Sequence, residues 1–150
     1  MPAFTFRLEA VLQHRRRVEE DCQRKLAAAQ AVLAAEQRRL DGLEASRDRH
    51  GEDLRLKLQH HLTASDMLCF QRYIIRLADD IAGQQARVAA AAKAVAQRRT
   101  DLVAALKKRQ VLDRLKEKQK MGAAAKERRQ EQDFTNEMAV TRYARTRRPA

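Results

Sequence analysis

The sequence contains almost nothing that interrupts a helix. Its only prolines are Pro2 and Pro149, so no residue between them lacks a backbone N–H or forces a kink. The four glycines are scattered along the chain, and each costs about 1 kcal/mol in a helix relative to alanine. Alanine, leucine, arginine, glutamine, lysine and glutamate dominate the remainder, and all are strong helix formers. We therefore expect an all-α protein built from long helices.

Aromatic residues and long apolar runs are also scarce. The chain has no tryptophan and only 4% aromatic residues, so we expect no enclosed pocket that could hold a substrate. We accordingly predict that the protein is not an enzyme and that it binds no cofactor. No run of apolar residues exceeds five, which argues against a transmembrane helix and a signal-peptide core. These absences favour a cytoplasmic protein.

The two cysteines and the adjacent histidines do not form a pattern typical of a disulfide or a metal site. Cys22 and Cys69 are expected roughly 55 Å apart along the helices, which excludes a disulfide between them. We interpret both as packing residues. His60 and His61 would point about 100° apart on a helix, so they could not chelate one metal ion together.

Aliphatic residues recur every seven positions in two rows, one in each half of the chain. The first row consists of Leu12, Leu26, Leu33, Leu40 and Leu54, and the second of Ile74, Ile81, Val88, Val95 and Leu102. A seven-residue apolar repeat forms a stripe that a helix buries against another helix. Folding the chain about Ala64 places Leu40 opposite Val88 and Leu54 opposite Ile74. The spacing predicts a long antiparallel two-helix coiled-coil hairpin.

We expect this hairpin to form one domain over residues 1–150. The elements are a helix at about 4–62, a turn at about 62–66, a helix at about 66–140 and a frayed basic tail at about 141–150. Thr63 and Asp66 have the spacing of a capping box, which supports a helix start at the turn.

Four residues near the seam invite a more specific interpretation. Arg47 and Arg98 interrupt the apolar rows, and a charged residue at a core position can fix the register of a coiled coil. Phe70 falls opposite Leu58 and is expected in the core. Tyr73 lies one step off the apolar row, where an aromatic side chain can anchor a partner, so it is a candidate contact at the bend end.

Positive charge is concentrated at the open end of the predicted hairpin. The formal net charge is +12, and residues 107–150 carry 14 Lys and Arg against 6 Asp and Glu, a net charge of +8. The predicted register places residues 14–17, which are also basic, beside this band. Such a surface favours an acidic protein surface, nucleic acid or acidic lipid as partner, unless it is simply a solvated helix face without a specific partner. The absence of a base-reading module and of aromatic stacking platforms argues against nucleic acid.

Two short blocks resemble the flagellar export protein FliJ family. The first is residues 4–15, in which a phenylalanine pair, an Arg-Leu step and a Val-Leu step precede a basic, glutamate-rich helix. The second is residues 112–119 together with 128–132. The resemblance implies a non-enzymatic central stalk of the type III export apparatus, at the cytoplasmic face of the inner cell membrane. Its implied partners are the hexameric export ATPase FliI, the export gate protein FlhA and export chaperones.

We expect the ATPase contact at the open end, where the basic runs and both family-like blocks meet. The candidate residues there are Phe4, Phe6, Arg7, Arg109, Arg114, Leu115, Lys116 and Lys118. The stalk protein of virulence-associated type III injectisomes would share the hairpin shape and is the alternative within the same class. A basic coiled coil that binds nucleic acid is the alternative outside it.

Overall fold

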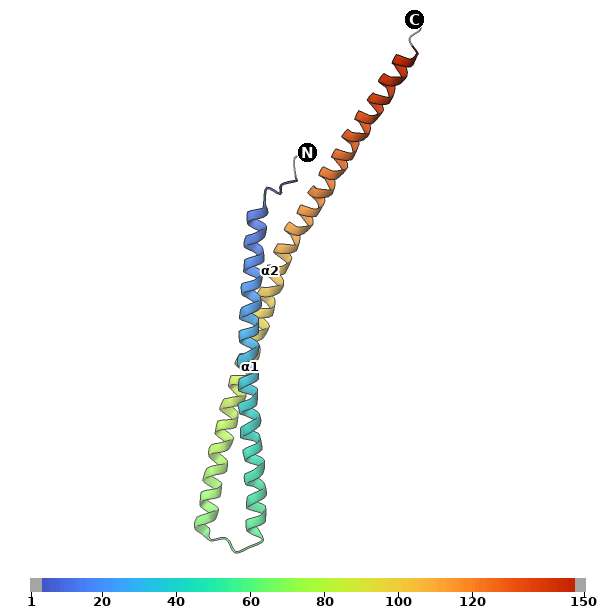
Figure 1. Cartoon of the computed structure of the whole chain (residues 1–150). Helices are drawn as coiled ribbons and strands as arrows, with labels where there is room; N and C mark the ends of the chain where they lie inside the picture. Colours follow the sequence, from blue (N-terminus) through green and yellow to red (C-terminus); the bar gives the residue numbers. More distant parts are fainter. Residues whose placement is uncertain (1–3, 148–150) are drawn as a thin grey trace. The chain divides into compact units, whose positions relative to one another are not determined.

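The computed structural model describes residues 4–147, which form two long helices (Figure 1). α1 spans Glu9–Leu58 and α2 spans Ala64–Thr146, and the described residues contain no strand. Residues 59–63 form the loop that reverses the chain. The protein is an all-α helical hairpin, as the composition and the two apolar rows predict. None of the helices within residues 4–147 is long and apolar enough to span a membrane.

α1 begins and ends a few residues inside the limits expected from the sequence. It starts at Glu9 rather than near residue 4, because the aromatic and β-branched residues before it are weak helix formers. The N–H of Glu9 donates to the carbonyl of Phe6 at 3.1 Å, which closes the turn before the helix. α1 ends at Leu58, so the loop begins earlier than the turn expected at 62–66.

α2 begins where the capping pattern indicates and continues further than expected. The Thr63 hydroxyl accepts a hydrogen bond from the Asp66 N–H at 3.2 Å and donates one to the Asp66 carboxylate at 2.7 Å. This reciprocal cap satisfies a backbone donor of the first turn and fixes the helix start. α2 then runs to Thr146, past residue 141, where fraying was expected. Residues 148–150 of the expected tail lie outside the described residues.

Packing divides the chain into two units, each of which combines a part of α1 with a part of α2. Unit 1 consists of Met1–Val18 and Ala105–Ala150, and unit 2 consists of Glu19–Ala104. Unit 1 buries Phe6, Leu12 and Ala105, and Leu12 has no exposed surface.

The core of unit 2 forms around Leu40. This side chain clusters with Leu77 and Ile81, and Leu43 and Val88 pack against the cluster as half-buried neighbours. Leu40 thus shares its cluster with Leu77 and Ile81 of α2, whereas Val88, the residue predicted opposite it, only borders the cluster. The two apolar rows therefore meet, but at Leu40 they are staggered rather than face to face as predicted.

The residues expected to fix the register lie outside the seam. Arg47 pairs with Asp48 at 3.2 Å and Arg98 with Asp101 at 3.6 Å, and their side chains are 52% and 45% exposed. The prediction that these arginines fix the register is wrong, because a long cationic side chain at a seam edge turns its charged end to water. Unit 2 instead buries the polar side chains of Glu19 and Gln84.

Candidate partner-binding surfaces

The N-terminal segment of unit 1 presents one aromatic side chain and buries another. Phe6 is buried, so it anchors the segment and is not available to a partner. Phe4 remains 38% exposed and lines a shallow hollow of about 500 Å³ with Ala123, Ala124 and Glu127 of α2. Arg7, between the two aromatics and the first turn of α1, is exposed. The segment thus offers Phe4 and Arg7 for contact.

Ion pairs join the start of α1 to α2 within unit 1. Lys116 donates to the Glu9 carboxylate at 2.7 Å, and Arg16 donates to Asp113 at 3.3 Å. Asp113 also accepts a hydrogen bond from Arg109, one turn earlier on α2. The hydrogen bond from Lys116, followed by that from Gln13, lowers the pKa of Glu9 below its ordinary value. These contacts engage Arg109 and Lys116 inside the unit.

A second group of basic side chains on α2 remains exposed. Arg114 and Lys118 are one helical turn apart, and neither forms an ion pair within residues 4–147. Together with Met121, which is 68% exposed, and with the carboxylates of Asp113 and Glu117, they line a shallow hollow of about 410 Å³. We call Arg114, Lys118 and Met121 the basic-apolar surface. It combines two cations with an exposed thioether, a combination suited to a partner that presents acidic and apolar groups.

The structure places all eight residues predicted for the ATPase contact in unit 1 and separates them by accessibility. The exposed members are Phe4, Arg7, Arg114 and Lys118. The members that are buried, half-buried or engaged in ion pairs are Phe6, Arg109, Leu115 and Lys116. The sequence could not make this separation, because both groups contain the same residue types at similar spacings.

Sequence reasoning missed an apolar surface on the last part of α2. Every residue from 121 to 147 is exposed, and this stretch includes Phe134, Met138 and Tyr143. Phe134 and Met138 are four residues apart and therefore share one face of the helix. An isolated helix of this kind is marginally stable in water, which favours a partner that covers it. The signal in the sequence was a pair of large apolar residues one turn apart in a polar segment.

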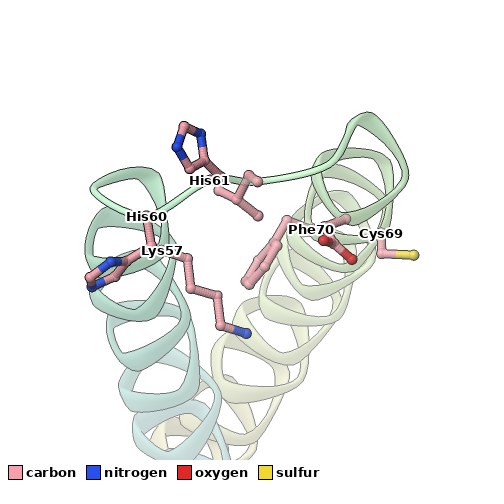
Figure 2. Close-up of a pocket in the computed structure, with 7 residues that line it drawn as sticks. Lys57, His60, His61, Cys69 and Phe70 are labelled. Atoms are coloured by element: carbon pink, nitrogen blue, oxygen red, sulfur yellow. The ribbon is translucent and has the colours of Figure 1, made fainter.

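The bend end of unit 2 carries two contacts between the helices. The rings of His50 and Tyr73 lie 4.2 Å apart between centroids, and Tyr73 is 41% exposed. Lys57 places its ammonium nitrogen 5.0 Å from the centroid of the Phe70 ring. Figure 2 shows Lys57 and Phe70 pointing toward one another between the helices, whereas Cys69 points away from them. The cation covers one face of a ring that was expected in an apolar core.

Exposed aliphatic side chains surround these contacts. The exposed aliphatic residues nearest the bend are Leu56, Leu58, Leu68, Ile74 and Ile75, which lie on more than one side of the two helices and which we call together the bend patch. Leu58 is 56% exposed, so the expectation that it packs opposite Phe70 is wrong, because α1 ends at this residue. Where exposed apolar residues are contiguous on the surface of a protein, they mark a site of interaction with a partner. The sequence indicated Tyr73 alone at this end, since the patch residues lie mainly outside the heptad rows.

Cys22 is half-buried, whereas Cys69, which was also interpreted as a packing residue, is exposed. Cys22 and Cys69 are both free thiols. Within the described part of the chain, no group of three or more His, Cys, Asp or Glu side chains is placed to hold a metal ion. His60 and His61 border a hollow of about 260 Å³ at the bend together with Lys57 and Phe70.

The described residues form an α-helical hairpin that exposes basic and apolar side chains. The model of the family "Flagellar FliJ protein" matches residues 4–148, which is nearly the whole chain. This protein belongs to the flagellar FliJ protein family, whose members are non-catalytic components of type III protein export.

A solved structure has a similar fold. It is that of a proposed YscO homolog from Chlamydia trachomatis, with a TM-score of 0.57 and 21% sequence identity. The similarity covers 97% of this chain and 100% of that chain. A search of curated proteins found no match.

Proposed function

We propose that this protein is a central-stalk component of the flagellar type III export apparatus. In this role it couples the hexameric export ATPase FliI to the export gate protein FlhA and assists the cycling of export chaperones. It is then peripheral at the cytoplasmic face of the inner cell membrane. The family match over residues 4–148 supports the export assignment. The observation that carries the coupling role is that each packing unit exposes a distinct contact surface.

The proposed ATPase contact is the open end, in unit 1. Phe4, Arg7, Arg114 and Lys118 are exposed there and supply the contact itself. The ion pairs of Lys116 with Glu9 and of Arg16 with Asp113 hold α1 against α2 beneath it. Two cations beside an exposed methionine favour an acidic and apolar rim on the partner, with an association that weakens as salt increases.

The proposed gate contact is the bend end, in unit 2. Tyr73 and the bend patch present aromatic and aliphatic surface without a covering element from residues 4–147. Aromatic anchors surrounded by apolar residues contribute most of the binding free energy in many interfaces. Tyr73→Ala is therefore expected to weaken binding to FlhA at least tenfold without loss of helicity, whereas the control Val32→Ala, at an exposed position of the same unit, should leave binding unchanged. Equal affinities for the two variants would contradict this placement.

The ATPase contact is tested by charge reversal at the basic-apolar surface. Arg114→Glu with Lys118→Glu is expected to abolish stimulation of ATP hydrolysis by FliI and of its ring assembly. The matched control is Arg38→Glu with Lys93→Glu, which changes the same two residue types at exposed positions of unit 2. Both variants have the same net charge, so only a site-specific contact distinguishes them. Equal stimulation by the two variants, with equal helicity in circular dichroism, would refute the open-end placement.

The injectisome stalk remains the alternative within the same class. The similarity to a YscO homolog concerns the fold, which both kinds of stalk would share, whereas the family match favours the flagellar system. Binding to flagellar FliI, with an injectisome ATPase as the comparison, separates the two. Nucleic-acid binding is separated by a gel shift with random duplex DNA at physiological salt, where we expect no complex.

A further inference from the structure

One buried polar contact of unit 2 joins Gln84 of α2 to Glu36 of α1. Gln84 is 7% exposed, and its side-chain amide donates to the backbone carbonyl of Glu36 at 2.9 Å. The same amide donates to the Glu36 carboxylate, whose side chain is only 19% exposed. Gln84 lies three residues after Ile81 and Glu36 lies four before Leu40, so the contact borders the apolar cluster. A hydrogen bond to a carboxylate is stronger than one between neutral groups.

The apolar rows alone do not select one register. They repeat every seven residues, and a shift of α2 by one heptad along α1 moves it about 10 Å. After such a shift the places of Leu77 and Ile81 beside Leu40 would be taken by Gln84 and Val88, or by Phe70 and Ile74. Leu40 would keep at least one apolar neighbour in either shifted register, so the apolar rows by themselves do not exclude these registers.

A shifted register would lose the hydrogen bond from the Gln84 amide to the Glu36 carboxylate. A shift of one heptad would bring Leu43 or Ala29 to the place that Glu36 now occupies beside Gln84. The backbone carbonyl of either residue could accept from Gln84, but neither side chain contains an acceptor. Because a buried amide that loses a partner is destabilised, both shifted registers are less favourable than the observed one.

We infer that the Gln84–Glu36 contact selects the register of unit 2 from a set of registers one heptad apart. Gln84 is a positioning residue, because its contact with Glu36 determines which residues of α2 pack against Leu40. The shift that brings Leu43 to Gln84 would also move the bend about three residues later and break the Thr63–Asp66 cap. The register thus determines which residues the bend end presents.

The inference is tested by measuring one distance between the helices with spin labels. Cysteines replace exposed Gln30 and Ala78 of unit 2, in a full-length chain that also carries Cys22→Ser and Cys69→Ser. Pulsed electron paramagnetic resonance then gives the label-to-label distance. With Gln84 and Glu36 intact, we expect one distance.

Gln84→Leu is expected to add a second distance displaced by about 10 Å, with the ratio of shifted to native register raised about tenfold. Glu36→Leu should do the same, whereas Glu36→Gln, which keeps an acceptor oxygen, should retain one distance. Gln85→Leu is the matched control, because Gln85 is adjacent and exposed. The thermal midpoint of Gln84→Leu should equal or exceed that of the parent chain, since leucine is favourable at a seam position.

Three results would overturn the inference. A single unshifted distance in both Gln84→Leu and Glu36→Leu, with helicity retained, would show that another feature sets the register. If Gln85→Leu shows the second distance in the same proportion as Gln84→Leu, the change of register does not depend on the buried contact of Gln84. Loss of helicity in both leucine variants would show that the contact stabilises the fold rather than selecting its register.

Discussion

Leu40 is the side chain whose removal tests the packing of unit 2 most directly. It is 8% exposed and lies in the buried cluster with Leu77 and Ile81. Leu40→Ala removes three carbon atoms from this cluster, and transfer of these atoms to water costs about 2.4 kcal/mol. Incomplete collapse of the resulting cavity raises the expected loss to about 3 kcal/mol. This value is near the lower limit for buried leucines, because a two-helix core can relax toward the removed atoms.

The assay is urea unfolding followed by circular dichroism at 222 nm, with thermal unfolding as a second measure. A loss of about 3 kcal/mol corresponds to a decrease of about 6 to 12 °C in the melting temperature for a chain of this length. Leu56→Ala is the control, because Leu56 is 50% exposed, and we expect a change within about 0.5 kcal/mol. Equal losses for the two variants, or a loss below about 1 kcal/mol for Leu40→Ala, would refute the cluster as the core of unit 2.

Three further predictions concern polar contacts. The pKa of Glu9 is lowered in the folded state from its ordinary value of 4.5. The contact of Glu9 with Lys116 therefore stabilises the protein fully above about pH 4.5, and this stabilisation is lost as the pH falls through the lower pKa of the folded state. Glu9→Gln should therefore reduce the difference between urea midpoints measured at pH 7 and pH 3, and an unchanged difference would contradict the contact. Asp113→Asn should destabilise unit 1 by up to about 1 kcal/mol in low salt, because Arg16 and Arg109 lose their shared carboxylate, and the effect should shrink in 1 M NaCl. Thr63→Ala should cost about 1 kcal/mol in thermal unfolding through loss of the α2 cap, whereas Thr63→Ser keeps the hydroxyl and should leave the midpoint nearly unchanged.

Several features of the candidate sites could be predicted from the sequence because they depend on local composition. The basic residues of unit 1 and the aromatic Tyr73 were identified by charge and by their position relative to the heptad rows. Whether a cation is available to a partner depends instead on which carboxylate lies across the helix pair. Lys116 meets Glu9, whereas Lys118, two residues later on another face of α2, meets no acidic partner within residues 4–147. No local pattern distinguishes these two lysines.

Composition and residue spacing are enough to establish that the protein is helical and that its chain reverses once. Proline is absent from the interior, strong helix formers dominate, and two apolar rows with a period of seven must be buried against each other. The Thr63–Asp66 cap also follows from local chemistry, because its two partners are three residues apart.

The stagger of the two apolar rows and the burial of Gln84 beside them depend on contacts between the helices, which the spacing of residues does not reveal. A period of seven leaves the axial alignment open by one heptad, so Leu40 could not be assigned to Ile81 or Val88 from spacing alone. For the same reason Arg47 and Arg98 seemed suitable register residues, although the structure turns both toward solvent and buries Gln84 instead. The burial of the Gln84 amide depends on acceptors of Glu36 on the opposite helix, 48 residues away in the chain, and no local pattern reveals such a partner.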